Sequence, residues 1–317
     1  MTTRAGRATA AVAMAVGLAL TLVVTGCSSA ASHAGATTTP LTTVPRPVGV
    51  TPSTGCHGSP PPPGTTRGTL TVGGQRRTYL ITVPKATSPA PLVLLFHGFA
   101  SSAAKFSDLT QLPQRAAARG MVTVAPDGTG HTWGAPDPAF ITALLHHVEQ
   151  STCVDLHRVF LTGFSAGAAF TISYGCKHPD EIAAMAPVAV DFPLGCTRPT
   201  SILVFHGTAD PMVAYPAGGE GQSLPGVKVA GTPADMAAWA RLGRCHPTPT
   251  TRRVGSQVTH FAWTGCAGAT EVGLYRIDGG GHTWPGADPS KAIGLTTRQV
   301  SATDQILAFF ARHRLGD

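Results

Sequence analysis

The stretch from Val159 to Ala169 constrains the fold of this chain more than any other. An apolar, β-branched run leads into Gly163-Phe164-Ser165-Ala166-Gly167, and a segment rich in Ala and Phe that can form a helix follows. This order predicts a strand, a sharp turn and a helix, the context in which a Gly-x-Ser-x-Gly motif presents its serine as a nucleophile. Both glycines leave room where strand and helix backbones approach each other. Ser165 is therefore the candidate nucleophile, and the alternative, in a chain with 37 glycines, is an ordinary turn.

The first 64 residues are expected to lie outside the folded domain. Residues 1–27 combine Arg4 and Arg7 with an apolar run and end at Cys27, which small residues precede, as in a lipoprotein signal peptide with a lipidated cysteine. A plain secretory signal or a short membrane anchor would show a similar pattern. Residues 28–64 are rich in Ser, Thr, Ala and Pro and are predicted to form a tether. We then expect a catalytic domain over 65–317, held by the lipid on the extracellular face of the cell membrane.

The remainder of the chain alternates between strand and helix patterns. Gly73-Gly74 between two β-rich runs predicts a hairpin. Apolar or β-branched runs predict strands at 69–72, 77–83, 91–96, 121–125, 159–161, 182–190, 202–205 and 272–277. Helices are expected at 111–119, 139–151, 166–177, 234–242 and 298–313. Such alternation predicts an α/β fold with a mostly parallel sheet and helices on both faces.

Composition excludes few functions but argues against some. Hydrophobic residues make up 43% of the 317 residues, which allows one large core. The formal net charge of +7 is scattered along the chain, so no nucleic-acid partner is expected, although weak attraction to an anionic cell surface is compatible with it. No dinucleotide fingerprint or P-loop is present, so no cofactor is expected. His146-His147 lacks acidic or cysteine partners at ligand spacing, so no metal is expected either.

A serine hydroxyl near neutral pH needs a base, and the base needs an orienting acid. Asp210 and His282 each follow a predicted strand, so in a parallel sheet both would lie at the same edge as Ser165. The chain order Ser, Asp, His is that of an α/β-hydrolase. His282 would then be the base and Asp210 its orienting acid. Taken singly, Asp210 could be a turn residue before proline and His282 a loop histidine, and Asp278 is a rival acid.

Two backbone amides are candidates for binding the negative charge of the transition state. One is the N–H of Ala166, directly after the candidate nucleophile, and the other is the N–H of Phe99 in the loop that follows the strand 91–96. His97 begins that loop and could be mistaken for a base; we interpret it as a structural support. Trp133 and Trp284 lie near loops expected to face the site and would either line a substrate pocket or pack in the core.

The chain has seven cysteines, and six remain if Cys27 carries lipid. An even number in an exported protein favours three disulfides, for which six cysteines allow 15 pairings. Cys245 and Cys266 flank one excursion of the chain, and Cys176 and Cys196 bracket a predicted strand. Cys56 and Cys153 are then paired by elimination. The predicted disulfides are Cys245–Cys266, Cys176–Cys196 and Cys56–Cys153.

Four motifs together resemble the secreted polyhydroxybutyrate depolymerase-like esterases, a group that includes the feruloyl and acetylxylan esterases of carbohydrate esterase family 1. They are His97-Gly98, Gly163 to Gly167, His206-Gly207-Thr208-Ala209-Asp210-Pro211 and Gly279 to Gly286. With the cysteine motif at the signal peptide, the pattern most resembles the actinobacterial lipoprotein esterases of this group. The resemblance covers about residues 65–315. It implies an α/β-hydrolase fold and ester hydrolysis by Ser165, Asp210 and His282.

We therefore expect an exported serine carboxylesterase that works through an acyl-enzyme. Its expected substrate is a polymer end, a polysaccharide-linked acyl group or a small ester, and its expected contact with the membrane is the lipid anchor. Three alternatives remain open: a serine peptidase of the same fold, a cell-wall acyltransferase and a non-catalytic surface-binding lipoprotein.

Overall fold

A computed structural model describes residues 49–85, 89–219 and 229–316. The predicted signal peptide over 1–27, with Cys27, and most of the predicted tether therefore lie outside the described residues. The strands are β1 (Gly64–Val72), β2 (Gln75–Val83), β3 (Ala90–Phe96), β4 (Val122–Pro126), β5 (Val154–Phe164), β6 (Ala184–Val188), β7 (Ser201–Gly207), β8 (Thr250–Arg253), β9 (Val258–Trp263) and β10 (Val272–Ile277). The α-helices are α1 (Ala103–Thr110), α2 (Leu112–Ala117), α3 (Asp137–Ser151), α4 (Ala166–Lys177), α5 (Thr232–Leu242) and α6 (Ala302–Ala311).

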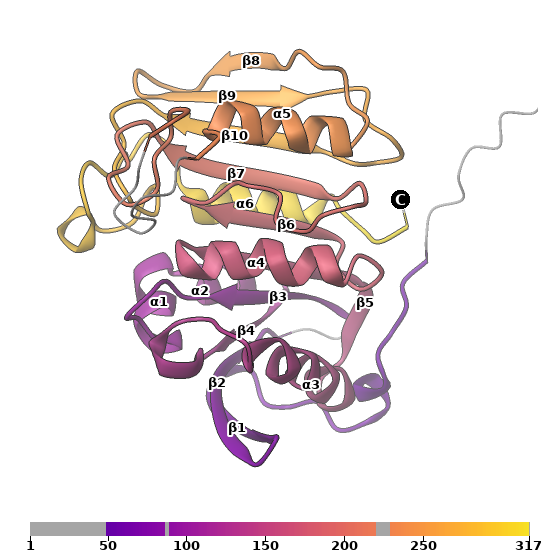
Figure 1. The fold of residues 1–317 in the computed structure, drawn as a ribbon. Coiled ribbons are helices and arrows are strands. Elements are labelled where there is room, and N and C mark those ends of the chain that lie inside the picture. Colours follow the sequence, from indigo (N-terminus) through magenta and orange to yellow (C-terminus); the bar gives the residue numbers. More distant parts are fainter. Residues whose placement is uncertain (1–48, 86–88, 220–228, 317) are drawn as a thin grey trace, which may run out of the picture. The chain divides into compact units, whose positions relative to one another are not determined.

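These strands form one sheet in the order β1-β2-β4-β3-β5-β6-β7-β10-β9-β8 (Figure 1). The central strands β4, β3, β5, β6, β7 and β10 are parallel to one another. The hairpin β1–β2 adds antiparallel strands at one edge, and β9 and β8 do so at the other. The predicted α/β fold with a mostly parallel sheet is confirmed.

Helices cover both faces of the sheet, as predicted (Figure 1). Successive residues of β3 alternate between two hydrophobic clusters, because neighbouring side chains of a strand point to opposite faces. The first cluster contains Phe140 of α3, Tyr174 of α4 and Trp239 of α5. The second contains residues of α1, α2 and α6, among them Phe310. Burial on both faces explains why the central strands have continuous apolar sequences.

Three elements were not predicted from the sequence: α1, β8 and β9. Strand β8 consists of exposed Thr and Arg residues, so it carries no apolar pattern and is held by pairing with β9 alone. Helix α1 is short, and its N-cap is Ser102, whose hydroxyl accepts a hydrogen bond from the Lys105 N–H. Short or exposed elements of this kind depend on their neighbours rather than on their own sequence pattern.

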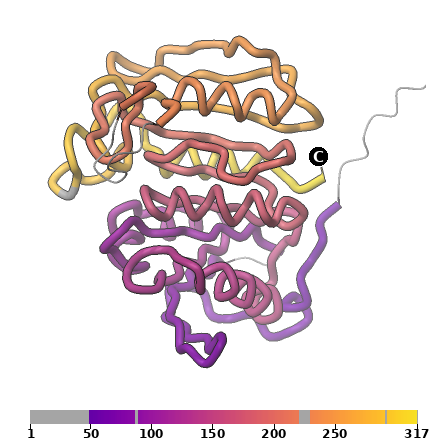
Figure 2. The backbone as a smooth tube through the Cα atoms, in the orientation of Figure 1, coloured from indigo at the N-terminus to yellow at the C-terminus, as the bar shows by residue number. Residues whose placement is uncertain are grey.

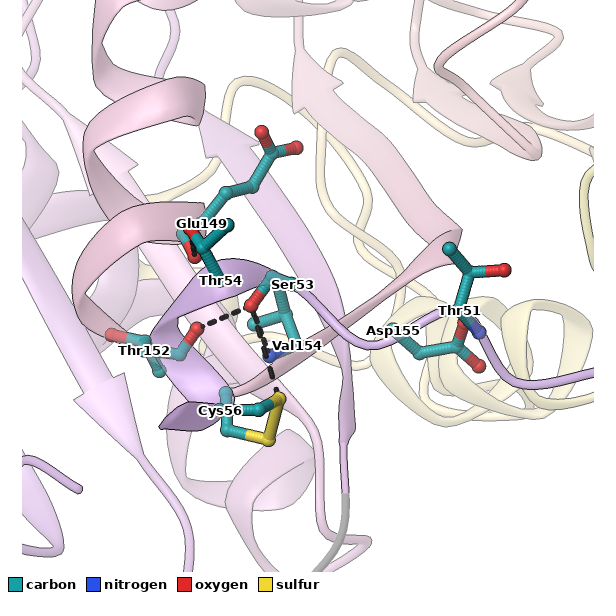
Figure 3. Close-up of a disulfide and its surroundings, with 9 residues drawn as sticks. Thr51, Ser53, Thr54, Cys56, Glu149, Thr152, Val154 and Asp155 are labelled. Atoms are coloured by element: carbon teal, nitrogen blue, oxygen red, sulfur yellow. Dashed lines mark hydrogen bonds between the residues drawn. A yellow bond between two sulfur atoms is a disulfide. The ribbon is translucent and has the colours of Figure 1, made fainter. Parts of the chain in front are cut away.

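The folded unit begins before residue 65, the boundary predicted for the domain. Pro52 forms a β-bridge with Asp155 at the start of β5. The Ser53 hydroxyl donates a hydrogen bond to the Thr152 carbonyl over 2.9 Å and accepts one from the Val154 N–H over 3.1 Å (Figure 3). Residues from about 51 onward are thus part of the domain, since their polar groups form hydrogen bonds with β5 and with the residues just before it.

The structure contains the three disulfides expected from the sequence: Cys56–Cys153, Cys176–Cys196 and Cys245–Cys266. Such a set is typical of proteins that fold in an oxidising compartment. The Cys56–Cys153 bridge joins the segment before β1 to the start of β5 (Figure 3). In the described part of the chain, no helix has both the length and the apolar character needed to cross a bilayer.

The parallel strands all end at the same side of the sheet, the side of their carboxyl ends, and this positions the candidate site. In Figure 2 the segments that follow β7 and β10 lie together at the left of the view, where these strands end. The Cys56–Cys153 bridge directly precedes β5, so it lies at the opposite side of the sheet, where the parallel strands begin.

Replacing both Cys56 and Cys153 with serine should lower the free energy of unfolding by about 2–5 kcal/mol, because the bridge closes a loop of 97 residues. Denaturant titration would measure this loss. Activity below the unfolding transition should be unchanged, since the bridge is remote from the edge where β5, β7 and β10 end. A variant as stable as the unmodified protein would show that the bridge contributes little.

Candidate active site

Ser165 occupies a strained turn between β5 and α4. Its backbone has φ 55° and ψ −119°, a conformation that residues other than glycine rarely adopt. The Ser165 N–H donates to the carbonyl of Val188 in β6 over 3.0 Å, which fixes the turn to the sheet. A Cβ atom at Gly163 would overlap the Gly167 carbonyl, and one at Gly167 would overlap the carbonyls of Phe96 and His97. The two glycines are therefore required by the close approach of β3, β5 and α4.

Asp210 and His282 are joined by a buried hydrogen bond. His282 Nδ1 donates to Asp210 Oδ2 over 2.8 Å, although these residues are 72 positions apart in the chain. Asp210 Oδ1 accepts hydrogen bonds from the N–H groups of Met212 and Val213, at 2.8 and 2.9 Å. Burial alone would raise the pKa of Asp210, but the hydrogen bonds from His206 and His282 hold it well below its usual range. Asp210 is thus an anion that orients the His282 ring.

Ser165 and His282 line the same cavity, whose volume is about 670 Å³. The His282 ring packs against Phe164, with 4.7 Å between the ring centroids, so the imidazole lies beside the residue that precedes Ser165. Among the hydrogen bonds of the described residues, none joins the Ser165 hydroxyl to His282. The structure therefore brings the three candidate residues to one cavity, with the acid and the base in direct contact.

The rival residues are engaged elsewhere. Asp278 pairs with Arg276 Nε at 2.8 Å and with Arg253 at 3.4 Å. His97 uses both ring nitrogens in contacts with backbone groups: Nδ1 lies 2.7 Å from the Gly98 carbonyl oxygen, and Nε2 accepts the N–H of Gly128, which follows β4, over 3.0 Å. Burial lowers the pKa of His97. His97 is thus a neutral support of the loop after β3, as expected.

Both candidate amides lie at the cavity and are available to a ligand. Phe99 is the second residue of a turn closed by the Ser101 N–H and the Gly98 carbonyl, and Ala100 has the positive φ, 55°, that a type II turn needs at its third residue. Ala166 is the first residue of α4, so its N–H has no acceptor within the helix. Within the described residues, neither N–H donates a hydrogen bond to a backbone carbonyl.

The cavity wall is apolar. It is formed largely by aromatic and aliphatic side chains, and His282 is the only ionisable residue among those that line it in the described part of the chain. Sequence reasoning did not identify most of these side chains, because they come from segments far apart in the chain. Phe99 was identified for its backbone N–H, and Phe164 is identifiable from its place inside the Gly-x-Ser-x-Gly motif. The apolar lining residues are Phe99, Phe106, Leu109, Phe164, Val190, Phe192, Met212 and Ile293.

Trp133 and Trp284 pack in the protein and do not line this cavity. Trp133 stacks on Phe170 and donates its indole N–H to the His97 carbonyl over 2.7 Å, so it supports the loop after β3. Trp284 is buried and donates to the Thr303 hydroxyl over 3.0 Å. Trp284 lines a smaller space of about 80 Å³ that His282 also borders. Of the two alternatives, the structure favours packing, because both rings contact neighbouring aromatic side chains and neither lines the larger cavity.

No group of three or more His, Cys, Asp or Glu residues in the described chain could hold a metal ion. His147 lies edge-on to Tyr79, with 6.3 Å between the ring centroids.

Comparison with known proteins finds relatives among esterases. The chain is 30% identical over 214 residues to feruloyl esterase B of Piromyces equi, spanning 61% of this chain and 39% of that protein. It is 27% identical to the putative esterase NocK of Nocardia uniformis, over 77% of this chain and 82% of the relative. It is 25% identical to feruloyl esterase D of Neurospora crassa, over 79% and 89%. The chain thus spans about two fifths of the first relative and most of the other two. No family model matches.

Solved structures share the fold at low identity. Acetyl xylan esterase from Aspergillus awamori has a TM-score of 0.55 and 14% identity, over 78% of this chain and 99% of that one. An S-formylglutathione hydrolase from Agrobacterium tumefaciens has a TM-score of 0.51 and 14% identity, over 80% and 95%. These likenesses confirm the predicted α/β-hydrolase fold and, at this identity, nothing finer.

Substituting Gly167 with alanine should destabilise the turn at Ser165, since the added methyl group overlaps the carbonyls of Phe96 and His97. We expect a loss of about 1–3 kcal/mol in the free energy of unfolding, together with reduced reactivity of Ser165 toward a fluorophosphonate. Gly49→Ala is the matched control, because a Cβ atom there meets nothing within 4 Å. Equal stability and labelling in both variants would contradict the close approach described here.

Proposed function

We propose that this chain, an α/β-hydrolase related in sequence to the feruloyl esterases, is a serine carboxylesterase that cleaves acyl esters through an acyl-enzyme. The observation that carries the proposal is the 2.8 Å hydrogen bond from His282 to buried Asp210, in the wall of the cavity that holds the strained Ser165. The esterase relatives support the reaction class. The Ser–Asp–His order along the chain supports the assignment of roles.

In the proposed reaction, His282 is the general base. Because its Nδ1–H is donated to Asp210, the other ring nitrogen, Nε2, is left to take the proton of the Ser165 hydroxyl. The Ser165 oxygen attacks the ester carbonyl carbon, and the imidazolium returns its proton to the leaving alcohol. Water, deprotonated by the same nitrogen, then releases the acid and restores Ser165. Asp210 stabilises the imidazolium in both steps without taking its proton.

Two amides would bind the oxyanion that forms when the carbonyl carbon becomes tetrahedral. We assign them as the N–H groups of Ala166 and Phe99, which line the cavity and have no backbone acceptor among the described residues. The N-terminus of α4 adds the positive end of its helix dipole at Ala166. Since both donors are held by the packing of β3, β5 and α4, little reorganisation is needed as charge develops.

The cavity favours an uncharged, apolar portion of the ester. Its volume of about 670 Å³ is in the range of small-molecule sites, and its wall is mostly hydrocarbon. The ester would be a polysaccharide-linked acyl group, a polymer end or a small ester with an apolar acyl group. His282 is the only ionisable side chain of the described lining, so no other side chain there would recognise an ionic group on the substrate.

We also infer that the enzyme is exported and anchored by lipid on Cys27 at the extracellular face of the membrane. Three disulfides support passage through an oxidising compartment. The apolar run before Cys27 supports the signal peptide over 1–27, and the Ser-, Thr- and Pro-rich composition supports a tether after it. In this arrangement the tether ends near residue 50, where the chain joins β5.

Ser165→Ala should abolish ester hydrolysis while leaving the fold intact. A loss of kcat on the order of 10⁶-fold is expected when a nucleophile of this kind is removed. Hydrolysis of p-nitrophenyl acetate and labelling by a fluorophosphonate would be measured alongside circular dichroism. Ser290→Ala, at an exposed serine, is the control and should behave as the unmodified protein. Full residual turnover in Ser165→Ala would refute the assignment of the nucleophile.

A substrate panel tests the reaction class and the substrate together. We expect turnover of p-nitrophenyl acyl esters and of at least one of methyl ferulate, acetylated xylan and short hydroxybutyrate oligomers. Cleavage of peptides without cleavage of esters would identify a peptidase instead. Transfer of the acyl group to an added sugar in place of hydrolysis would identify an acyltransferase.

Cys27→Ser should release the protein from the membrane fraction, because no lipid could be attached at that position. Cell fractionation of the variant and the unmodified protein, with and without globomycin, would measure this. Cys56→Ser serves as the control, since Cys56 is in a disulfide. Identical fractionation of the Cys27 variant and the unmodified protein would contradict lipid anchoring.

A further inference from the structure

Besides His282, a second buried histidine contacts Asp210: His206 of β7. Its side chain has no exposed surface. Its Nε2 atom lies 3.1 Å from the Val213 carbonyl oxygen and 3.5 Å from Asp210 Oδ2. Its Nδ1 atom lies 2.8 Å from Oδ2 of Asp191, in the segment that follows β6. His206 does not line the cavity, so it can affect the reaction only through Asp210.

The neighbours of His206 require a proton on each ring nitrogen. The Val213 carbonyl can only accept, so Nε2 must donate to it. Nδ1 faces the Asp191 carboxylate, which also accepts, and the hydroxyl oxygen of Thr232, 3.0 Å away, can do the same. An imidazole with two donated protons is an imidazolium cation. Burial alone would lower the pKa of His206, but the charge and hydrogen bond of Asp191, together with those of Asp210, raise it.

In the described chain, four titratable groups surround this cation. Asp191 and Asp210 contact it directly. Asp235 of α5 shares a hydrogen bond with Asp191, and burial together with the negative charge of Asp191 raises the pKa of Asp235 to about 6. The Tyr215 ring meets His206 edge-on at 5.6 Å, and burial raises the pKa of Tyr215 to about 12, so it stays neutral. Asp191 and Asp210 are therefore the anions in contact with His206, and Tyr215 is neutral.

Asp210 needs this cation in the resting enzyme. The Asp210 side chain is fully buried, and a buried carboxylate without a neighbouring positive charge is strongly unfavourable. His282 supplies a positive charge only while it holds the proton of Ser165. Outside that step, His206 is the cation in contact with Asp210.

We propose that His206 is a positioning residue that carries a permanent positive charge against Asp210, held by Asp191, and so keeps Asp210 ionised and directed at His282. This role rests on the proposed esterase function. It makes the cluster Asp191–His206–Asp210 an extension of the catalytic residues into the core between β6 and β7.

The positive charge on His206 also acts on the base. It offsets part of the negative charge of Asp210, so Asp210 attracts the proton on His282 less strongly. The acid limb of kcat/KM, which reports the base in the free enzyme, should lie correspondingly lower.

The test removes the ion pair as a unit with His206→Gln and Asp191→Asn together, so that no unpaired charge is left buried. In the full-length protein, kcat for p-nitrophenyl acetate should fall by about 10- to 100-fold, the cost of misplacing a catalytic group by about 1 Å. KM should stay within about twofold. The acid limb of kcat/KM should move to higher pH, because His206, the positive charge in contact with Asp210, is lost.

His260→Gln is the matched control, since His260 is a partly buried histidine of β9 that packs on Tyr275 and makes no contact with the cluster. It should leave kcat and the acid limb unchanged. If the double variant is folded by circular dichroism and keeps the original kcat and acid limb, His206 has only a structural role and the proposal is overturned. If the double variant does not fold, Asp191→Asn alone should still lower kcat. Unchanged kcat in that single variant would also overturn the proposal.

A second measurement does not depend on activity. Nitrogen-15 NMR of the histidine rings in the unmodified protein should show both ring nitrogens of His206 protonated across about pH 5 to 8, where ordinary histidines titrate. A neutral His206 ring at the upper end of this range would overturn the proposal. Absence of ester turnover and of fluorophosphonate labelling in the unmodified protein would instead refute the proposed function, and the role of His206 with it, while the NMR result would still stand.

Discussion

The candidate site depends on the strained backbone of Ser165. A non-glycine residue at φ 55° and ψ −119° costs on the order of 1–3 kcal/mol, and the surrounding packing must offset this cost. It does so by burying β5 between β3 and β6 and by seating α4 against the same sheet with glycine-sized contacts. Because the turn is so tight, the side chain of Ser165 and the first N–H of α4 face the same cavity. The proposed nucleophile and one proposed oxyanion donor therefore come from a single local constraint.

The acid and the base depend on the topology of the sheet. β5, β7 and β10 are not neighbours in the chain, but parallel pairing brings their carboxyl ends to one edge. Asp210 is reached within three residues of the end of β7, and His282 within five of the end of β10. Short connections to rigid strands hold these side chains closely, which explains how a 2.8 Å hydrogen bond can join residues 72 positions apart.

The charged groups at this side of the sheet lie in successive layers. The cavity wall that would meet the substrate is apolar, so electrostatic interactions inside it are only weakly screened. Behind it, Asp210 accepts two backbone N–H groups and the His282 N–H, and contacts His206. Behind that, Asp191 and Asp235 surround His206. Each buried charge thus has a partner in the next layer, the condition under which buried ionic groups are tolerated.

The sequence by itself determined the parallel α/β fold, its central strands, most of its helices and the residues of the candidate triad, because apolar strand runs and the Gly-x-Ser-x-Gly turn are local patterns. The same local patterns say nothing of β8, an exposed polar strand held by its neighbour, or of the cavity wall, which is assembled from residues of several separate segments. Trp133 and Trp284 show the limit: their positions allowed either a pocket or a packing role, and only the contacts of their rings with aromatic neighbours from other elements favour packing. Only the tertiary structure decided the charge on His206, because a histidine's protonation depends on which atoms surround its ring.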